Sequence, residues 1–206
     1  MTLLIGIMAD SHGQAEPIKA ALAAFETLSC QAVYHLGDVC DSGHPETAEA
    51  CLRLLQEQHV LMIRGNNDHA IIAKYTDRQN PIFAREVWRY LKAAPLTRYY
   101  QNAVFTHSLP FAGTLGLACM IGLMGQKEAR RSFDEFPHHI IFRGHSHSPE
   151  IVRPRARGAA SRRLGPGEIM DLAGRIPCVV TCGALTRGLY MVWNPLQNSI
   201  KSLSLA

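Results

Sequence analysis

Polar clusters that contain aspartate, asparagine or histidine follow five apolar runs of this sequence. In chain order the clusters hold Asp10 and His12, then Asp38, then Asn66, Asn67 and Asp68, then His107, and finally His145 and His147. Carboxylate, imidazole and amide groups suit Mn, Fe, Zn, Co or Ni, whereas a structural zinc site would draw on thiolates. The clusters therefore predict a site for divalent metal ions, provided that they meet in space.

The first part of the chain alternates between strands and helices in a way that would bring the clusters together. Residues 2–9, 31–36 and 59–64 are short apolar runs typical of buried strands. Between them, apolar side chains recur at helical spacing over residues 15–28 and 48–55. This β-α-β-α-β order predicts a parallel sheet, and the carboxyl ends of parallel strands line one crevice.

The second part continues with a helix over residues 84–91 and strands over 102–107 and 138–144. A glycine-rich stretch and a charged helix around 126–136 separate those two strands. The last three β segments, residues 178–183, 188–193 and 199–205, have no helix between them, so antiparallel pairing is expected there. The arginine-rich segment 153–163 contains Pro and Gly and is interpreted as a mobile, solvated loop.

Each cluster alone has an ordinary structural explanation. Asp10 and His12 could belong to a helix cap, and residues 66–68 could form an Asx turn. His107 could be a histidine with a satisfied hydrogen bond at the end of a strand. Five such clusters at one edge of one sheet are much harder to explain without a shared ligand, which favours the metal site.

The motifs "ADSHG", "GDVCD", "GNND", "THS" and "GHSH" occur in this order between residues 9 and 147. Together they resemble the signature of the calcineurin-like metallophosphoesterases, most closely the small stand-alone prokaryotic phosphodiesterases. The resemblance implies an α/β fold: a four-layer α/β/β/α sandwich of two mixed sheets, with the metal site at the C-terminal strand ends. It also implies one metallophosphoesterase domain over residues 1–206.

The resemblance further implies two divalent metal ions, with Mn expected first and Fe, Zn, Ni or Co as alternatives. The implied ligands are Asp10, His12 and His147 for one ion, Asn66, His107 and His145 for the other, and Asp38 as the bridge. Two cations about 3.5–4 Å apart can bind a hydroxide between them and neutralise charge on a phosphoryl group. The expected reaction is hydrolysis of a phosphodiester or phosphomonoester by in-line attack of that hydroxide.

Two positions depart from the family pattern. Larger members have a histidine after the metal-binding asparagine, and this chain has Asn67 there. Asn67 could orient a phosphoryl oxygen, while His69 or His44 could protonate the leaving group. Ser108 stands where the family usually has glycine.

Other functions and partners stay open. A scaffold of the same fold that binds protein partners is the main alternative, and nucleic-acid cleavage is another, suggested by the arginine-rich segment. A small phosphate ester is the expected substrate, with pocket walls from the loops at 69–81, 108–125 and 153–175. The apolar, glycine-rich part of the second loop could form a lid, a homodimer contact or core.

Composition narrows the class of protein. The chain has 206 residues with 47% hydrophobic and 18% charged side chains, as in ordinary globular domains. No run of 18 or more apolar residues predicts a membrane span, and the apolar N-terminus is too short for an export signal. We therefore expect a cytoplasmic protein in which the six cysteines are reduced. The net charge of +4 bears on partners only where basic residues cluster.

Overall fold

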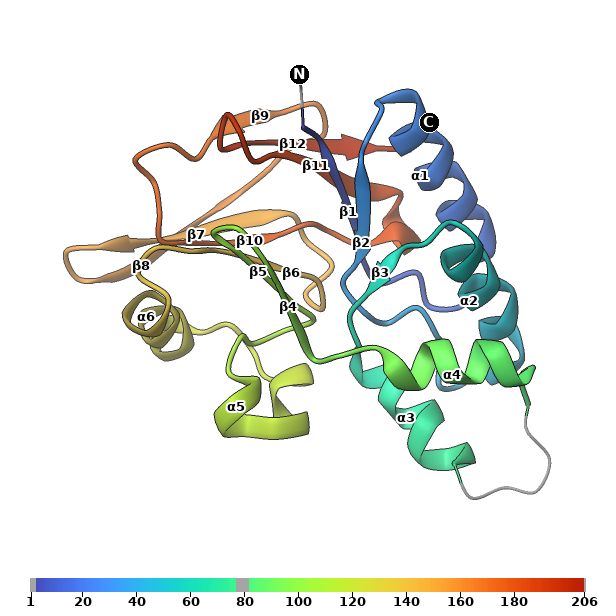
Figure 1. Ribbon diagram of the computed structural model, residues 1–206. Helices are drawn as coiled ribbons and strands as arrows, with labels where there is room; N and C mark the ends of the chain where they lie inside the picture. Colours follow the sequence, from blue (N-terminus) through green and yellow to red (C-terminus); the bar gives the residue numbers. More distant parts are fainter. Residues whose placement is uncertain (1–2, 77–81, 206) are drawn as a thin grey trace.

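The computed structural model describes residues 3–76 and 82–205, and its strands form two six-stranded mixed sheets (Figure 1). The first sheet has the order β3-β2-β1-β11-β12-β9, and the second has the order β4-β5-β6-β10-β7-β8. The first sheet therefore combines strands from the early and late parts of the chain, whereas the second is built from strands between residues 97 and 181.

The first sheet is built on the predicted β-α-β-α-β unit. Its parallel strands are β1 (Ile5–Met8), β2 (Ala32–His35) and β3 (Leu61–Met62), connected through α1 (Ala15–Thr27), η1 (Pro45–Thr47) and α2 (Ala48–Glu57). The strands β11 (Leu189–Asn194), β12 (Ser199–Ser204) and β9 (Ile169–Asp171) complete it in antiparallel fashion. Residues 188–193 and 199–205 thus pair as expected.

The second sheet has a parallel centre and antiparallel flanks. Its strands are β4 (Thr97–Tyr100), β5 (Ala103–Thr106), β6 (Ile140–Arg143), β10 (Cys178–Thr181), β7 (Glu150–Arg155) and β8 (Gly158–Arg163). β5, β6 and β10 are parallel, so the expectation of antiparallel pairing is wrong for β10 along its β6 edge. The chain between β5 and β6 forms α5 (Ala112–Leu115), η2 (Gly116–Met120) and α6 (Gln126–Glu135).

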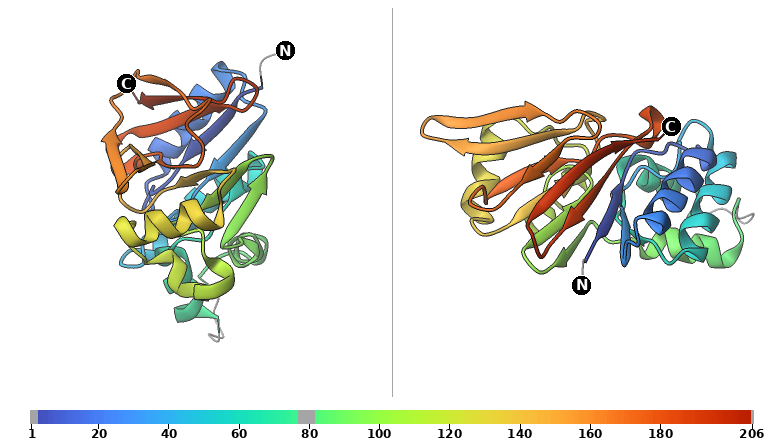
Figure 2. Two further views of the ribbon diagram at one scale, coloured as in Figure 1. Left: turned by 90° about the vertical axis from the view of Figure 1, so that its left-hand side faces the viewer. Right: turned by 90° about the horizontal axis from the view of Figure 1, so that it is seen from above.

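Four layers result, as the family resemblance implies. Figures 1 and 2 show α1, α2 and α4 (Arg85–Ala93) outside the first sheet and α6 outside the second. Large aromatic side chains fill the space between the sheets, where the rings of Tyr34 and Phe105 stack with centroids 4.0 Å apart. Trp193 is fully buried in the same core. Burial of this apolar surface holds the two sheets together.

Residues 66–68 begin α3 (Asn66–Tyr75) and so do not form the Asx turn that was their alternative structural explanation. Asp68 stands at the third position of the helix and accepts a hydrogen bond of 2.9 Å from the backbone N–H of Gly65. Such a contact satisfies a free N–H at a helix start. Most of the loop expected at 69–81 is therefore helical up to residue 75, and residues 77–81 lie outside the described residues.

The arginine-rich segment also differs from the expectation, since a β-hairpin of β7 and β8 replaces the mobile loop. Six residue pairs join the strands, from Glu150–Arg163 to Arg155–Gly158. Ile151 and Val152 are buried on opposite faces and anchor the hairpin in two cores. Over residues 3–76 and 82–205, no helix combines the length and apolar character needed to span a bilayer.

Candidate metal centre

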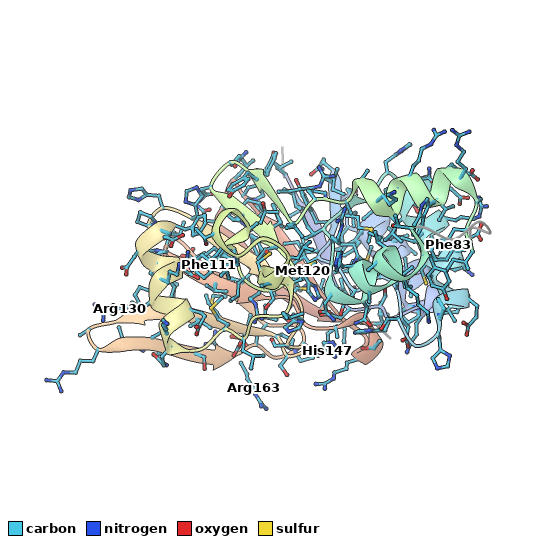
Figure 3. All side chains as sticks on the ribbon, turned by 90° about the horizontal axis from the view of Figure 1, so that it is seen from below. Phe83, Phe111, Met120, Arg130, His147 and Arg163 are labelled. Carbon is cyan, nitrogen blue, oxygen red and sulfur yellow. The ribbon has the colours of Figure 1, made fainter. Side chains whose placement is uncertain are left out.

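The seven side chains implied as ligands meet at one edge of the two sheets, in two groups. In the first group, Nε2 of His12 lies 3.2 Å from Nε2 of His147. Nε2 of His147 lies 3.7 Å from Oδ1 of Asp10. These three side chains could therefore coordinate one cation. Figure 3 shows His147 between the half of the molecule that carries Arg130 and the half that carries Phe83.

The second group surrounds the His107 ring. Nε2 of His107 lies 3.0 Å from Oδ1 of Asn66 and 3.1 Å from Nδ1 of His145. Two imidazole nitrogens and an amide oxygen at such distances form a donor set of the kind that transition metals take.

Asp38 lies between the two groups. Its Oδ2 is 3.9 Å from Nε2 of His12, and its Oδ1 is 3.6 Å from Nε2 of His107. Each carboxylate oxygen thus faces a histidine of a different group. This is the arrangement in which one carboxylate can bridge two cations.

The backbone at these residues is unusual. The candidate ligands with a positive φ are Asp10 (56°), His12 (43°), Asp38 (54°), His145 (66°) and His147 (59°). Residues other than glycine seldom adopt this conformation, and it persists where surrounding contacts enforce it. Here the turns bind one another: the N–H of Asp10 donates to the carbonyl of Gly37 at 3.0 Å, and that of His12 to Asp38 at 3.0 Å. The five side chains therefore converge because the strand-end turns are tied together.

Two glycines allow these turns to approach closely. A Cβ atom at Gly37 would lie 2.6 Å from the backbone nitrogen of Gly65 and 2.8 Å from Nδ1 of His107. A Cβ atom at Gly65 would lie 2.2 Å from Oδ1 of Asp38. The Gly-Asp and Gly-Asn pairs of the sequence thus have a steric cause.

A backbone contact sets the orientation of His107. Its Nδ1 lies 2.8 Å from the carbonyl oxygen of Leu36, which can only accept a hydrogen bond. Nδ1 therefore carries the proton, and the lone pair of Nε2 faces Asn66 and Asp38. Such a contact to the second ring nitrogen is usual for histidines that bind metals.

Asp68 is a residue of the site that sequence reasoning placed in the third polar cluster without giving it a role. Its buried carboxylate accepts hydrogen bonds of 2.9 Å from the backbone N–H groups of Asp38, Cys40 and Gly65. Burial, followed by the charge of Asp38, raises the pKa of Asp68 to about 6. The third position of a helix that follows a glycine is the signal that could have indicated this role.

The electrostatics of the site fit cations. Burial and then the charge of Asp38 raise the pKa of Asp10 well above its ordinary value. Oδ1 of Asp10 is buried and, within the described residues, has no hydrogen-bond partner. Burial, with smaller effects of His107 and Arg143, lowers the pKa of His145 to about 4, so its ring is neutral near pH 7. A partnerless carboxylate oxygen near the neutral imidazole of His145 belongs to a donor set that a divalent ion would satisfy.

The residues considered for catalysis occupy three different positions. Asn67 contacts Asp38 through its backbone N–H (to Oδ1) and through its side-chain amide (to Oδ2), each at 2.8 Å. His69 lies on α3, and its buried Nδ1 has no partner within the described part of the chain. His44 is exposed and pairs with Glu46 at 3.3 Å.

Arg143 lies behind the site, fully buried, and binds neutral groups. Its Nε donates to the carbonyl of Ser108 at 2.9 Å, and its Nη2 lies 3.0 Å from Oγ of the same serine. Weaker contacts of 3.3 Å reach Ser146 and Thr181. Ser108, the residue that departs from the family pattern, thus connects the His107 turn to the turn that carries His145.

Arg187 is a second arginine of this edge that sequence reasoning did not single out. It ends η3 (Leu185–Arg187), which is fixed to the first turn because Leu185 N–H donates to Ala9 at 2.8 Å and Thr186 N–H to Asp10 at 3.3 Å. Its side chain is exposed and, within the described residues, forms no ion pair. After burial and His12, the charge of Arg187 lowers the pKa of His147. Arg187 therefore places an uncompensated positive charge beside the first ligand group.

Comparisons with solved structures agree with this architecture. A metallophosphoesterase from Sphaerobacter thermophilus matches with a TM-score of 0.79 at 19% identity, covering 100% of this chain and 89% of its own. The hypothetical protein PH1004 from Pyrococcus horikoshii OT3 matches with a TM-score of 0.63 at 14% identity, covering 98% and 88%. A novel archaeal phosphodiesterase matches with a TM-score of 0.52 at 17% identity, covering 98% and 100%. At these identities the likeness shows the fold alone.

A comparison with curated proteins found no match. The family model of the calcineurin-like phosphoesterase superfamily domain, however, matches residues 3–186. This range contains all five motifs and both groups of candidate ligands. The resemblance that the motifs indicated is therefore confirmed, and the chain belongs to the calcineurin-like phosphoesterase superfamily.

Proposed function

We propose that this protein is a cytoplasmic hydrolase that cleaves a small phosphodiester or phosphomonoester by in-line attack of water, with two divalent metal ions as cofactors. The observation that carries the proposal is the position of Asp38, whose two carboxylate oxygens face His12 and His107 at 3.9 and 3.6 Å. A single carboxylate between two histidine groups suits a dinuclear site better than a mononuclear one. The phosphoesterase superfamily supports the reaction class.

The ions, for which Mn is proposed ahead of Fe, Zn, Ni and Co, would be held by the residues that the motifs indicate. These are Asp10, His12 and His147 on one side, Asn66, His107 and His145 on the other, and Asp38 between them. When bound, such ions lower the pKa of water and neutralise charge on phosphoryl oxygens. Asp10 and Asp38 supply only two negative charges, so the loaded site would attract an anionic ester.

The remaining residues of the site would orient these groups and the substrate. Asn67 fixes the carboxylate plane of Asp38, and the Leu36 carbonyl fixes the proton on His107. Arg187 would attract a phosphoryl oxygen to the His147 side. His69 is proposed as the group that protonates the leaving oxygen. The proposed catalytic unit is one domain over residues 1–206.

The test is hydrolysis of p-nitrophenyl phosphate and bis-p-nitrophenyl phosphate with Mn²⁺ present. We expect Asp38→Asn and His107→Gln to lose at least about a hundredfold in kcat/KM, and EDTA to inactivate the wild type until Mn²⁺ is restored. Asp171→Asn is the matched control, because Asp171 is exposed on β9 and, among the residues that the structure describes, accepts only the N–H of Ala173, at 2.7 Å.

Measurement of the metal content of the purified protein by elemental analysis tests the same proposal without an activity assay. Two metal equivalents per chain are expected for the wild type after Mn²⁺ loading, and fewer for Asp38→Asn. Full activity in Asp38→Asn would refute the mechanism. A wild-type protein that takes up no metal and hydrolyses neither ester would instead favour the protein-binding scaffold.

A further inference from the structure

A second site of interest lies in the second sheet, at the ends of the strands that point away from the candidate metal centre. There a cavity of about 200 Å³ is lined by Arg153, Pro154, Arg155, Gly174, Arg175 and Ile176. Half of these residues are arginines, and none is acidic. The hollow is therefore strongly basic and belongs to no element of the proposed catalytic site.

Strand geometry explains why the arginines share one hollow. Side chains alternate along β7, so Arg153 and Arg155 project from the same face as Ile151, which is buried between the sheets. The core between the sheets ends after Ile151, and Arg153 and Arg155 occupy the same face of β7 beyond it. Arg175 comes from the segment between β9 and β10 and closes the hollow from the other side.

These three guanidinium groups are electrostatically uncompensated. Within the described part of the chain, Arg153, Arg155 and Arg175 form no ion pair and no side-chain hydrogen bond. Their neighbour Arg162 differs, because its Nη1 lies 2.5 Å from Oε1 of Glu168. Glu168 thus compensates the charge of Arg162. The charges of Arg153, Arg155 and Arg175 have no such partner within the described residues and repel one another.

Arg153 shows the effect of this crowding. It is half-buried, and burial followed by the charges of Arg175, Arg155 and Arg162 lowers its pKa. Like charges around one hollow repel, and an anion in the hollow would replace that repulsion with attraction. Guanidinium groups also match phosphoryl oxygens geometrically, because each can donate two parallel hydrogen bonds.

The hollow is separate from the metal centre. Glu150 begins β7 three residues after His147, and the strand then runs away from that edge to Arg155. Five residues of extended chain span about 17 Å. In Figure 3 the free end of the β7–β8 hairpin lies toward Arg130, away from His147.

We propose that this arginine hollow binds a compact anion with two or more phosphoryl groups, such as a free polyphosphate or the di- or triphosphate of a nucleotide. Three cations call for more than one phosphate charge. A volume of about 200 Å³ is below the roughly 300–1,000 Å³ of pockets that enclose a whole drug-sized ligand. It suits a phosphate chain, and a nucleoside attached to it would extend into the adjoining hollow of about 540 Å³ that shares Pro154 and Arg155.

The experiment is isothermal titration of the full chain with sodium tripolyphosphate at 50 mM NaCl, without added divalent ions. One saturable site per chain is expected, with an affinity that falls as salt rises. Arg153→Gln/Arg175→Gln should weaken binding at least about tenfold, because two charge-assisted contacts are lost. Arg155→Gln alone should weaken it less.

Two controls separate this site from other causes. Arg85→Gln/Arg89→Gln removes the same charge from exposed positions on α4 and should leave binding unchanged. Asp38→Asn should also leave it unchanged, whereas Arg153→Gln/Arg175→Gln should retain esterase activity. The proposed anion site and the proposed catalytic function can therefore be refuted independently of each other.

Unchanged binding in Arg153→Gln/Arg175→Gln would overturn the proposal, and so would an equal loss in the α4 double variant, which would indicate only nonspecific charge. A further titration compares ATP with single-stranded oligodeoxythymidines of 5 and 15 nucleotides. We expect ATP to bind at least as tightly as either strand. Affinity that grows with strand length would reject the compact ligand in favour of nucleic acid.

Discussion

Asn67 holds both carboxylate oxygens of Asp38, one through its backbone N–H and the other through its side-chain amide, each at 2.8 Å. The amide oxygen of Asn67 is engaged as well, since the hydroxyl of Ser42 donates to it at 2.7 Å. The sequence suggests that Asn67 could orient a phosphoryl oxygen, and in the structure its side chain contacts Asp38 and Ser42. We therefore propose that Asn67 acts on the site through Asp38.

Replacement of Asn67 should accordingly weaken metal binding. Asn67→Ala removes one of two hydrogen bonds to Asp38, and loss of such supporting contacts costs about 10–100-fold in metal affinity. We expect the Mn²⁺ concentration for half-maximal activity to rise by that factor, while kcat at saturating Mn²⁺ changes less. Asn102→Ala, in the turn before β5, is the control. A fall in kcat with unchanged Mn²⁺ dependence would show direct contact with substrate.

Removal of the Arg187 charge should affect substrate binding. Arg187→Ala is expected to raise KM for p-nitrophenyl phosphate about tenfold, because one charge-assisted contact is worth roughly 1.5–3 kcal/mol before solvent screening, which reduces it at an exposed site. Arg187→Lys should recover part of the loss, and Arg89→Ala on α4 should have no effect. Equal KM values for wild type and Arg187→Ala would exclude the phosphate contact.

The role proposed for His69 depends on the leaving group. A general acid helps most when the departing alkoxide is a poor leaving group, and such catalysis contributes about 10²–10⁴-fold. We expect His69→Gln to lose about a hundredfold in kcat for an alkyl phosphate ester, but less than about threefold for the p-nitrophenyl ester. The exposed His138, changed to Gln, serves as the control. Equal effects on the two esters would assign His69 a structural role.

Stability should depend on pH through His35. Its Nε2 lies 3.1 Å from Oγ of Ser11, and burial, with smaller effects of His107 and His12, lowers the pKa of His35 from 6.5 to about 3. Because the unfolded chain binds this proton near pH 6.5 and the folded chain does not, the contribution of His35 is present above pH 6.5 and is lost as pH falls toward 3. The loss between pH 7 and 5 amounts to about 2 kcal/mol.

Urea unfolding at the two pH values measures this effect. The free energy of unfolding should fall by about 2 kcal/mol less in His35→Gln than in the wild type. His59→Gln is the control, since His59 is exposed after α2. An identical pH dependence in wild type and His35→Gln would show that folding does not lower the pKa of His35.

Several elements could be predicted because their cause is local. β1, β2 and α1 have apolar patterns that match their burial, and the polar clusters mark the strand ends. α3 was missed because its first turn has the composition of an Asx turn, and its buried apolar side chains, within the described residues, are Ile71 and Ile72 alone. The β7–β8 hairpin was missed because proline, glycine and five arginines hide the alternation.

Other features of the site depend on contacts between distant parts of the chain. Asp68 organises the Asp38 turn across 30 positions of sequence. Arg187 approaches His147 because η3 binds the backbone of Ala9 and Asp10. Local composition indicates that Asp68 can cap α3 but not which distant turn it contacts, and it gives no sign of the position of Arg187, since both contacts arise from the order of strands in the sheets.

The pairing of β1 with both β2 and β11 bears on how the chain assembles during translation. Ile5 to Ile7 align with Trp193 to Met191. One edge of β1 therefore stays unpaired until residues almost 190 positions later have been synthesised. Contacts of such long range form slowly, and an unpaired strand edge invites association with other chains. The nascent protein would thus carry an open β edge until β11 has been synthesised and pairs with β1.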